Sequence, residues 1–345
     1  MILYENGKWG FNAAQGWRGS VFPRALIMAV PNAVLAYLIT DQHGEFSDTT
    51  QDAAKYARSI LTIFTSVLTY ILYGRARNAY SRWWEGGTLL QQTRGEWFNS
   101  YSSLLAFVTA DSQREGEIEA YQHMLARIMS LLFCSALQQV SPNPDRPFEI
   151  LDSEGLERDS LAFMYESNDK VEVILQWVQR STIYNMQNGV IPTPPPVVSR
   201  AFQELSRGIV NLQNARKIAD FPYPFPFAQT ISVMLLLHWS LCPILSSIML
   251  NSRVWAAMIA FFVTFFLWCI NFIALELERP FGSGDNDLPM EQMQNDFNKS
   301  MATLLCKTGN TPPTFNYDPQ KHWKLERTMW SGGFFPEEPE DAQER

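Results

Sequence analysis

The sequence has few of the residues from which metal sites and catalytic centres are built. Its four cysteines are scattered, and none forms a CxxC pair: Cys134, Cys242, Cys269 and Cys306. This spacing indicates neither a zinc site nor a disulfide framework. The four histidines share no ligand spacing, and the motifs GxSxG, HExxH, the Walker lysine loop and GxGxxG are missing. The sequence therefore indicates no class of soluble enzyme.

Charged residues are also scarce, at 18% of the chain against about 25% in typical soluble domains. The formal net charge of −8 argues against nucleic acid as a partner. Lys, Arg, Asp and Glu are absent from residues 221–252 and again from residues 254–275, with Arg253 between the two stretches. Each stretch is long enough to cross a hydrocarbon layer of about 30 Å as a helix. Together they predict a hairpin of two transmembrane helices.

Two shorter uncharged runs occupy the N-terminal third, at residues 25–40 and 59–74. Each is at the short end for a transmembrane helix, and the alternative is a pair of buried helices in a soluble domain. Charge favours the membrane, because the segment between the runs is acidic while their outer ends are basic: Lys8, Arg18 and Arg24 before, and Arg75, Arg77 and Arg82 after. By the positive-inside rule, both outer ends lie in the cytoplasm or its equivalent.

We therefore expect an all-α membrane protein with four transmembrane helices and a large cytosolic helical part. Apolar residues at helical spacing, as at Ile118, Tyr121 and Leu125, predict helices in the long middle region, with proline breaks at residues 141–147 and 191–198. The expected order begins with an N-terminal cytosolic segment (1–24), two transmembrane helices (25–74) and a cytosolic helical region (75–220). Two more transmembrane helices (221–275), a cytosolic acidic loop with a helix (276–310) and a C-terminal tail (311–345) follow.

Four short strings stand beside these predicted helices. GWRGS (residues 16–20) precedes the first, SRWWEGG (81–87) follows the second, FPYPFPFAQT (221–230) leads into the third, and ELERPFGSGDNDLP (276–289) follows the fourth. In these strings, their order and their positions, the sequence resembles the bestrophin family of anion channels over residues 10–310. The NDLP ending is more similar to the bacterial and photosynthetic branches than to the animal one.

The resemblance implies a homopentamer around one central pore that conducts chloride or bicarbonate. In that family the second transmembrane helix lines a narrow hydrophobic neck, and this places Ser66, Tyr70 and Gly74 there. The family usually has bulky apolar residues at all three positions, so Ser66 and Gly74 depart from it. Either the neck is wider and wetter, or the lining face includes Val67 and Ile71. The alternative for this stripe is ordinary packing between subunits.

Two further pore elements follow from the same resemblance. Arg75 and Arg77 come just past the neck, where a ring of positive charges would attract anions; the alternative is that they anchor the helix or bind lipid headgroups. A second constriction, a cytosolic aperture, aligns to Val197 or Val198. The alternative there is a valine at the start of a helix.

In animal members of the family, the loop that aligns to GSGDNDLP holds calcium, which here makes calcium a tentative cofactor. Asp287 matches one acidic ligand, and Asp285 adjoins the other acidic position. Glu276 and Arg279 stand where backbone carbonyls would contribute, together with one near Leu3. Calcium takes six to eight oxygen ligands, so this set is thin. The alternative is that Asp285 or Asp287 caps the helix that follows.

The leading hypothesis is passive anion conduction, with further copies of the chain, the lipid bilayer and small anions as partners and no nucleic acid. The plasma membrane, a chloroplast or thylakoid membrane and other organelle membranes all fit. One rival is a non-conducting scaffold or regulator with the same fold. Another is a membrane-embedded enzyme, for which His238 is the ionisable residue within a predicted transmembrane helix.

Overall fold

The computed structural model describes residues 16–41, 48–250 and 252–324, and all regular secondary structure in these ranges is helical. Four helices are long and apolar enough to cross a membrane. They are α2 (Phe22–Asp41), the first part of α3 (Asp48–Ala106), α8 (Phe225–Met249) and α9 (Arg253–Leu277). The prediction of an all-α chain with four transmembrane helices is confirmed at this level.

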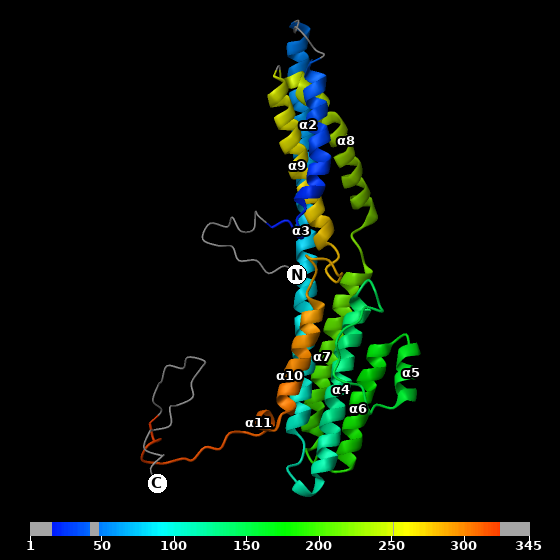
Figure 1. Ribbon diagram of the computed structural model, residues 1–345, viewed down its shortest axis with the longest axis vertical. Coiled ribbons are helices and arrows are strands. Elements are labelled where there is room, and N and C mark those ends of the chain that lie inside the picture. The colour runs from blue at the N-terminus through cyan, green and yellow to red at the C-terminus, as the bar shows by residue number, and fades with distance from the viewer. Residues whose placement is uncertain (1–15, 42–47, 251, 325–345) are drawn as a thin grey trace.

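Helix α3 is continuous over 59 residues, which corresponds to roughly 90 Å. It runs from the top of the transmembrane part almost to the bottom of the molecule (Figure 1). The boundary expected at Gly74 therefore lies inside one helix. A single glycine lowers helix stability by only about 1 kcal/mol, so it cannot end a helix that packs along both sides of its position.

The membrane bundle consists of α2, α8, α9 and the first half of α3, which pack against one another. Several of its buried polar side chains are hydrogen-bonded to other helices of the bundle, which lowers the cost of placing them in lipid. Asn32 donates to the Thr264 hydroxyl, and the Trp239 indole donates to the Met28 carbonyl at 2.8 Å. His238 is buried, lies 2.9 Å from the Thr65 hydroxyl and stacks on Phe64. It is a hydrogen-bonded packing residue, which does not support the membrane-enzyme alternative.

The helical body consists of the second half of α3 and the helices that surround it (Figure 1). Apart from the short η1 (Ser112–Arg114), these are α4 (Glu115–Val140), α5 (Arg158–Glu166), α6 (Lys170–Gln187), α7 (Pro195–Asp220), α10 (Met290–Leu305) and α11 (Lys307–Asn310). The helices expected from apolar spacing correspond to α4, α6 and α7. The proline break at residues 141–147 falls between α4 and α5, whereas the one at residues 191–198 extends into the first turn of α7, where proline is tolerated. The sequence patterns did not predict α5.

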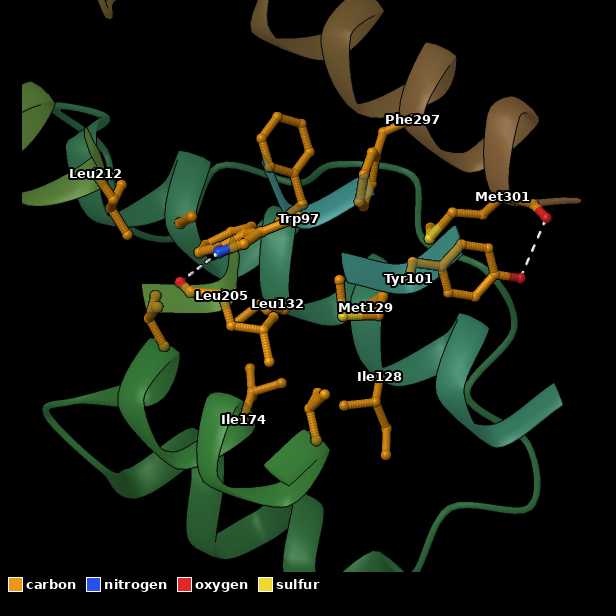
Figure 2. Close-up of a cluster of buried hydrophobic side chains, with 14 of the residues drawn as sticks. Trp97, Tyr101, Ile128, Met129, Leu132, Ile174, Leu205, Leu212, Phe297 and Met301 are labelled. Carbon is orange, nitrogen blue, oxygen red and sulfur yellow. Dashed lines mark hydrogen bonds between the residues drawn. The ribbon is translucent and has the colours of Figure 1, made fainter. Parts of the chain in front are cut away.

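The core of the body is aromatic and joins α3 to α4, α7 and α10. Trp97 and Tyr101 of α3 are fully buried with Phe133 and Phe297. Figure 2 shows the two polar atoms of this cluster satisfied by backbone: the Trp97 indole donates to the Leu205 carbonyl, and the Tyr101 hydroxyl to the Met301 carbonyl. A dry core of this kind fixes the lower half of α3 in place.

Candidate functional site

One face of α3 is left uncovered in a single chain. Ser66 is exposed, the Tyr70 side chain is 79% exposed, and the space beside Gly74 is open. These residues are four apart and so share one helix face. The same face continues through Arg77 to Trp84. The opposite face of α3 packs on α8 and α9 and carries the buried leucines of the bundle.

The two neighbouring neck candidates differ from each other. Val67 lies beside the uncovered face and is exposed, whereas Ile71 packs partly against the buried Leu68 and Leu72. The uncovered face is thus centred on Ser66, Tyr70 and Gly74 rather than shifted toward Ile71. That these residues line a neck stays a prediction, because it depends on how copies of the chain assemble.

The two aperture candidates have opposite surroundings at the start of α7. Val197 is 47% exposed, whereas Val198 is 1% exposed and belongs to the core of the body. Adjacent residues on a helix point about 100° apart, so one valine can face a passage only if the other does not. Val198 is therefore a packing residue, and Val197 remains as the aperture candidate.

Arg75 and Arg77 also differ in burial. The Arg75 side chain is 5% exposed, pairs with Glu278 at 2.9 Å, donates to Asn271 at 3.2 Å and lies over the Tyr223 ring. It joins α3 to the end of α9 and does not offer a free charge to a pore, which corrects its assignment to a basic mouth. Arg77 is exposed, and the described part of the chain gives it no ion-pair partner.

The four strings that carry the family resemblance meet where the membrane bundle joins the helical body. We call this region the junction: residues 16–20, 75–87, 218–230 and 276–291. Arg82 of SRWWEGG donates to three backbone carbonyls, those of Ile218, Phe221 and Glu278. The last turn of a helix leaves such carbonyls without partners. Arg82 therefore supplies hydrogen bonds to the C-terminal ends of both α7 and α9 and links them.

The glycines of SRWWEGG permit close packing against the ERPFGSGDNDLP loop. A Cβ at Gly86 would lie 3.0 Å from the Phe281 ring, and one at Gly87 would lie 3.2 Å from Leu288. The Trp83 indole donates to the Asn286 carbonyl at 3.1 Å, and Asn286 in turn donates to the carbonyl of Gly19 in GWRGS. The strings are therefore parts of one structural unit.

The loop of this junction was predicted to bind calcium, and its carboxylates have other partners. One Asp287 oxygen accepts the Gly284 N–H at 2.6 Å, and Asp285 pairs with Arg18 at 2.9 Å. Burial raises the pKa of the Asp287 carboxyl above its usual value, an effect that the Gly284 hydrogen bond opposes. Among the described residues, no three acidic, histidine or cysteine side chains are grouped as metal ligands.

The other members of the predicted set do not complete a calcium site. Glu276 and Arg279 were expected to contribute backbone carbonyls at the end of α9 and just after it, and the Glu276 side chain itself pairs with Arg24. Leu3 lies outside the described residues. Among the described residues, two carboxylates with other partners and two backbone carbonyls are fewer oxygens than the six or more that calcium takes. The capping alternative is wrong, because α10 begins after Pro289 and has no side-chain cap.

Arg146 is a junction residue that sequence reasoning missed. It lies in the SPNPDRP break between α4 and α5, donates to the Gly282 carbonyl at 2.7 Å and pairs with Glu291 at 2.9 Å. Together with Arg18 and the loop it lines a polar pocket of about 520 Å³. The only signal in the sequence is a basic residue held between two prolines, which does not reveal a partner far along the chain.

Comparison with known proteins agrees with this fold. The profile of the bacterial and fungal bestrophin proteins matches residues 1–303. A voltage-dependent anion channel-forming protein of the cyanobacterium Nostoc sp. (strain PCC 7120) is 26% identical over 251 residues, which cover 71% of this chain and 76% of that protein.

Solved structures lead to the same fold. Two substituted forms of a bacterial bestrophin homologue from Klebsiella pneumoniae superpose with TM-scores of 0.63 and 0.64 at 15% and 14% identity. The matches cover 82% and 81% of this chain and 97% of each of those chains. With four candidate transmembrane helices and a family profile over most of its length, the chain is a multi-pass membrane protein that belongs to the bacterial and fungal bestrophin family.

Proposed function

We propose that several copies of this chain, five by the family resemblance, surround one central pore and conduct small anions such as chloride or bicarbonate. The observation that carries the proposal is the uncovered face of α3, which runs from Ser66 to Trp84 and continues from the membrane bundle into the helical body. A pore requires such a face, because it must remain free of contacts within each subunit. The anion channel-forming relative from Nostoc supports this choice of function.

The chemistry of the uncovered face suits conduction. Near Tyr70 the face carries no fixed charge, so a neck there does not trap an ion. Arg77 lies about two turns further along the same helix, and in a closed ring it repeats once per subunit. A ring of guanidinium groups raises the local anion concentration. Val197 at the start of α7 is the candidate for a second constriction.

A planar-bilayer measurement tests this proposal. The purified protein is reconstituted under a potassium chloride gradient, and the reversal potential of the current is measured. We expect a reversal near the chloride equilibrium potential. A reversal near the potassium equilibrium potential would overturn the choice of anions, and an intact oligomer that carries no current under any voltage would favour a scaffold or regulator.

A further inference from the structure

The acidic segment of the junction, residues 276–291, carries five carboxylates, and arginines from other parts of the chain pair with four of them. These pairs are Arg24–Glu276, Arg75–Glu278, Arg18–Asp285 and Arg146–Glu291. The fifth carboxylate, Asp287, accepts the N–H of Gly284 within its own loop. Every carboxylate of the segment therefore already has an arginine or a backbone N–H as its partner.

We infer that arginines, rather than a divalent cation, close this loop against the helical body, with Arg146 as the residue that positions it. The inference concerns the loop at which the family resemblance predicts calcium. It rests on the proposed function only where current is the readout. Binding and stability measurements test it independently.

Arg146 bridges the two ends of the loop. Its guanidinium is donor to the Gly282 carbonyl at 2.7 Å and to the Glu291 carboxylate at 2.9 Å, and it lies over the Phe148 ring. A carbonyl and a carboxylate are the oxygens that a calcium ion uses. The planar fork of arginine supplies positive charge to both at fixed geometry. A cation at the same oxygens would have to displace a side chain that is only 14% exposed.

The four pairs differ in strength because they differ in exposure. The Arg18 side chain is 83% exposed, so its pair with Asp285 contributes little. The Arg75 pair is buried and ties α3 to α9, so its removal would disturb the membrane bundle itself. Arg146 lies between these extremes and comes from a loop of the body. It is therefore the arginine whose removal reports on the loop alone.

One oxygen of Asp287 is used within the loop itself. A Cβ at Gly282 would lie 2.3 Å from the Asp287 oxygen that accepts the Gly284 N–H, so this carboxylate is folded back over the loop's own backbone. Figure 1 shows the segment after α9 beside α3, where the bundle meets the body. The loop is thus stabilised internally by the Asp287–Gly284 hydrogen bond and anchored to the rest of the protein by arginines.

Terbium luminescence gives a binding readout that needs no current. Trp83 donates to the Asn286 carbonyl at 3.1 Å, so its indole adjoins the loop and can sensitise a bound lanthanide. For the intact full-length protein, titrated from about 1 µM to about 1 mM terbium, we expect no saturable signal that calcium displaces. The thermal unfolding midpoint should be the same in calcium and in chelator. A saturable, calcium-displaced signal or a midpoint raised by calcium would overturn the inference.

The variant Arg146→Gln tests whether Arg146 positions the loop. Removing the guanidinium leaves Glu291 and the Gly282 carbonyl without their donor, so we expect faster protease cleavage within residues 282–291 and a lower unfolding midpoint. The two oxygens that this releases are too few for calcium, so the midpoint of the variant should also be the same in calcium and in chelator. Arg146→Lys should restore part of the protection. Cleavage and midpoint unchanged from the wild type would overturn the role of Arg146.

Two further variants keep the test decisive. Arg216→Gln removes an ion pair within α7, that with Asp220, which holds neither Gly282 nor Glu291, and should leave loop cleavage and calcium response as in the wild type. If Arg146→Gln does not fold, the exposed Arg18→Gln replaces it, with a smaller effect of the same sign. Should the wild type carry no current, the proposed function fails, whereas the luminescence and unfolding results still decide how the loop is held.

Discussion

Tyr70 is the residue on which the proposed neck depends. Its side chain is exposed within one chain, so removing it does not disturb the packing of the subunit. If five copies converge on it, Tyr70→Ala should raise the single-channel conductance severalfold or weaken gating, because a bulky ring leaves the narrowest point. Single-channel recording in bilayers gives the measurement. Tyr184→Ala, at an exposed tyrosine on α6 of the helical body, is the control, and equal currents in both variants and the wild type would remove Tyr70 from the neck.

Asp287 allows a prediction about pH. Because folding raises the pKa of this carboxyl, its ionisation costs more in the folded than in the unfolded chain. This free-energy cost to folding is fully present when the pH lies above the folded-state pKa of Asp287. It disappears as the pH falls below that pKa toward the ordinary pKa of aspartate. Asparagine retains an oxygen for the Gly284 N–H without the charge.

Asp287→Asn should therefore equal or exceed the wild type in unfolding midpoint at neutral pH, and this difference should shrink on acidification. Thermal unfolding of both proteins across a pH series provides the comparison. A variant that is much less stable at neutral pH would show that the carboxylate charge itself holds the loop.

Sequence reasoning could find the neighbourhood of these residues but not their orientation. Arg75 and Arg77 look alike in the sequence, and only the fold brings Glu278, about two hundred positions away, against one of them. Val197 and Val198 are equally apolar, so only the rotation of α7 decides which one is buried. Arg146 escaped notice for the same reason, since its partners come from a distant loop.

At the scale of helices, the contact between α3 and α7 depends on Gly208. A Cβ at this position would lie 2.1 Å from the Trp97 indole nitrogen, which already donates to Leu205. Gly208→Ala should therefore destabilise the body by about 1–3 kcal/mol through overpacking. Gly95→Ala on α3 meets no neighbour and should be neutral or stabilising by up to about 1 kcal/mol. Denaturant unfolding measures the stability of both variants. Equal stabilities would contradict the dependence of the α3–α7 contact on Gly208.

The helices themselves were predictable where their signals are strong. Long uncharged runs gave the transmembrane helices, and apolar spacing gave α4, α6 and α7. Helix α5 has only nine residues, and a helix this short is marginal without tertiary packing. That membrane helices continue into the soluble part was expected in general, but the sequence did not show how far α3 extends, because hydropathy changes at the membrane surface while the helix does not.

At the scale of the whole molecule, Arg77 is the basic residue that assembly would multiply. Arg77→Glu changes the charge by two in every subunit, so in a closed ring it should shift the reversal potential under a salt gradient away from chloride and toward potassium. Arg216→Glu, on α7 and outside the uncovered face, is the matched control. A reversal potential that does not respond to Arg77→Glu would place the source of selectivity elsewhere.

The unbroken length of α3 has a mechanical consequence. A helix of 59 residues without an internal break behaves as a rod, and Arg75 and Arg82 pin it near its middle to the ends of α7 and α9. A rod held at such a fulcrum acts as a lever. If copies of α3 line a pore as proposed, a tilt that carried Tyr70 outward would swing the opposite end inward, so the two ends of that pore could not widen independently.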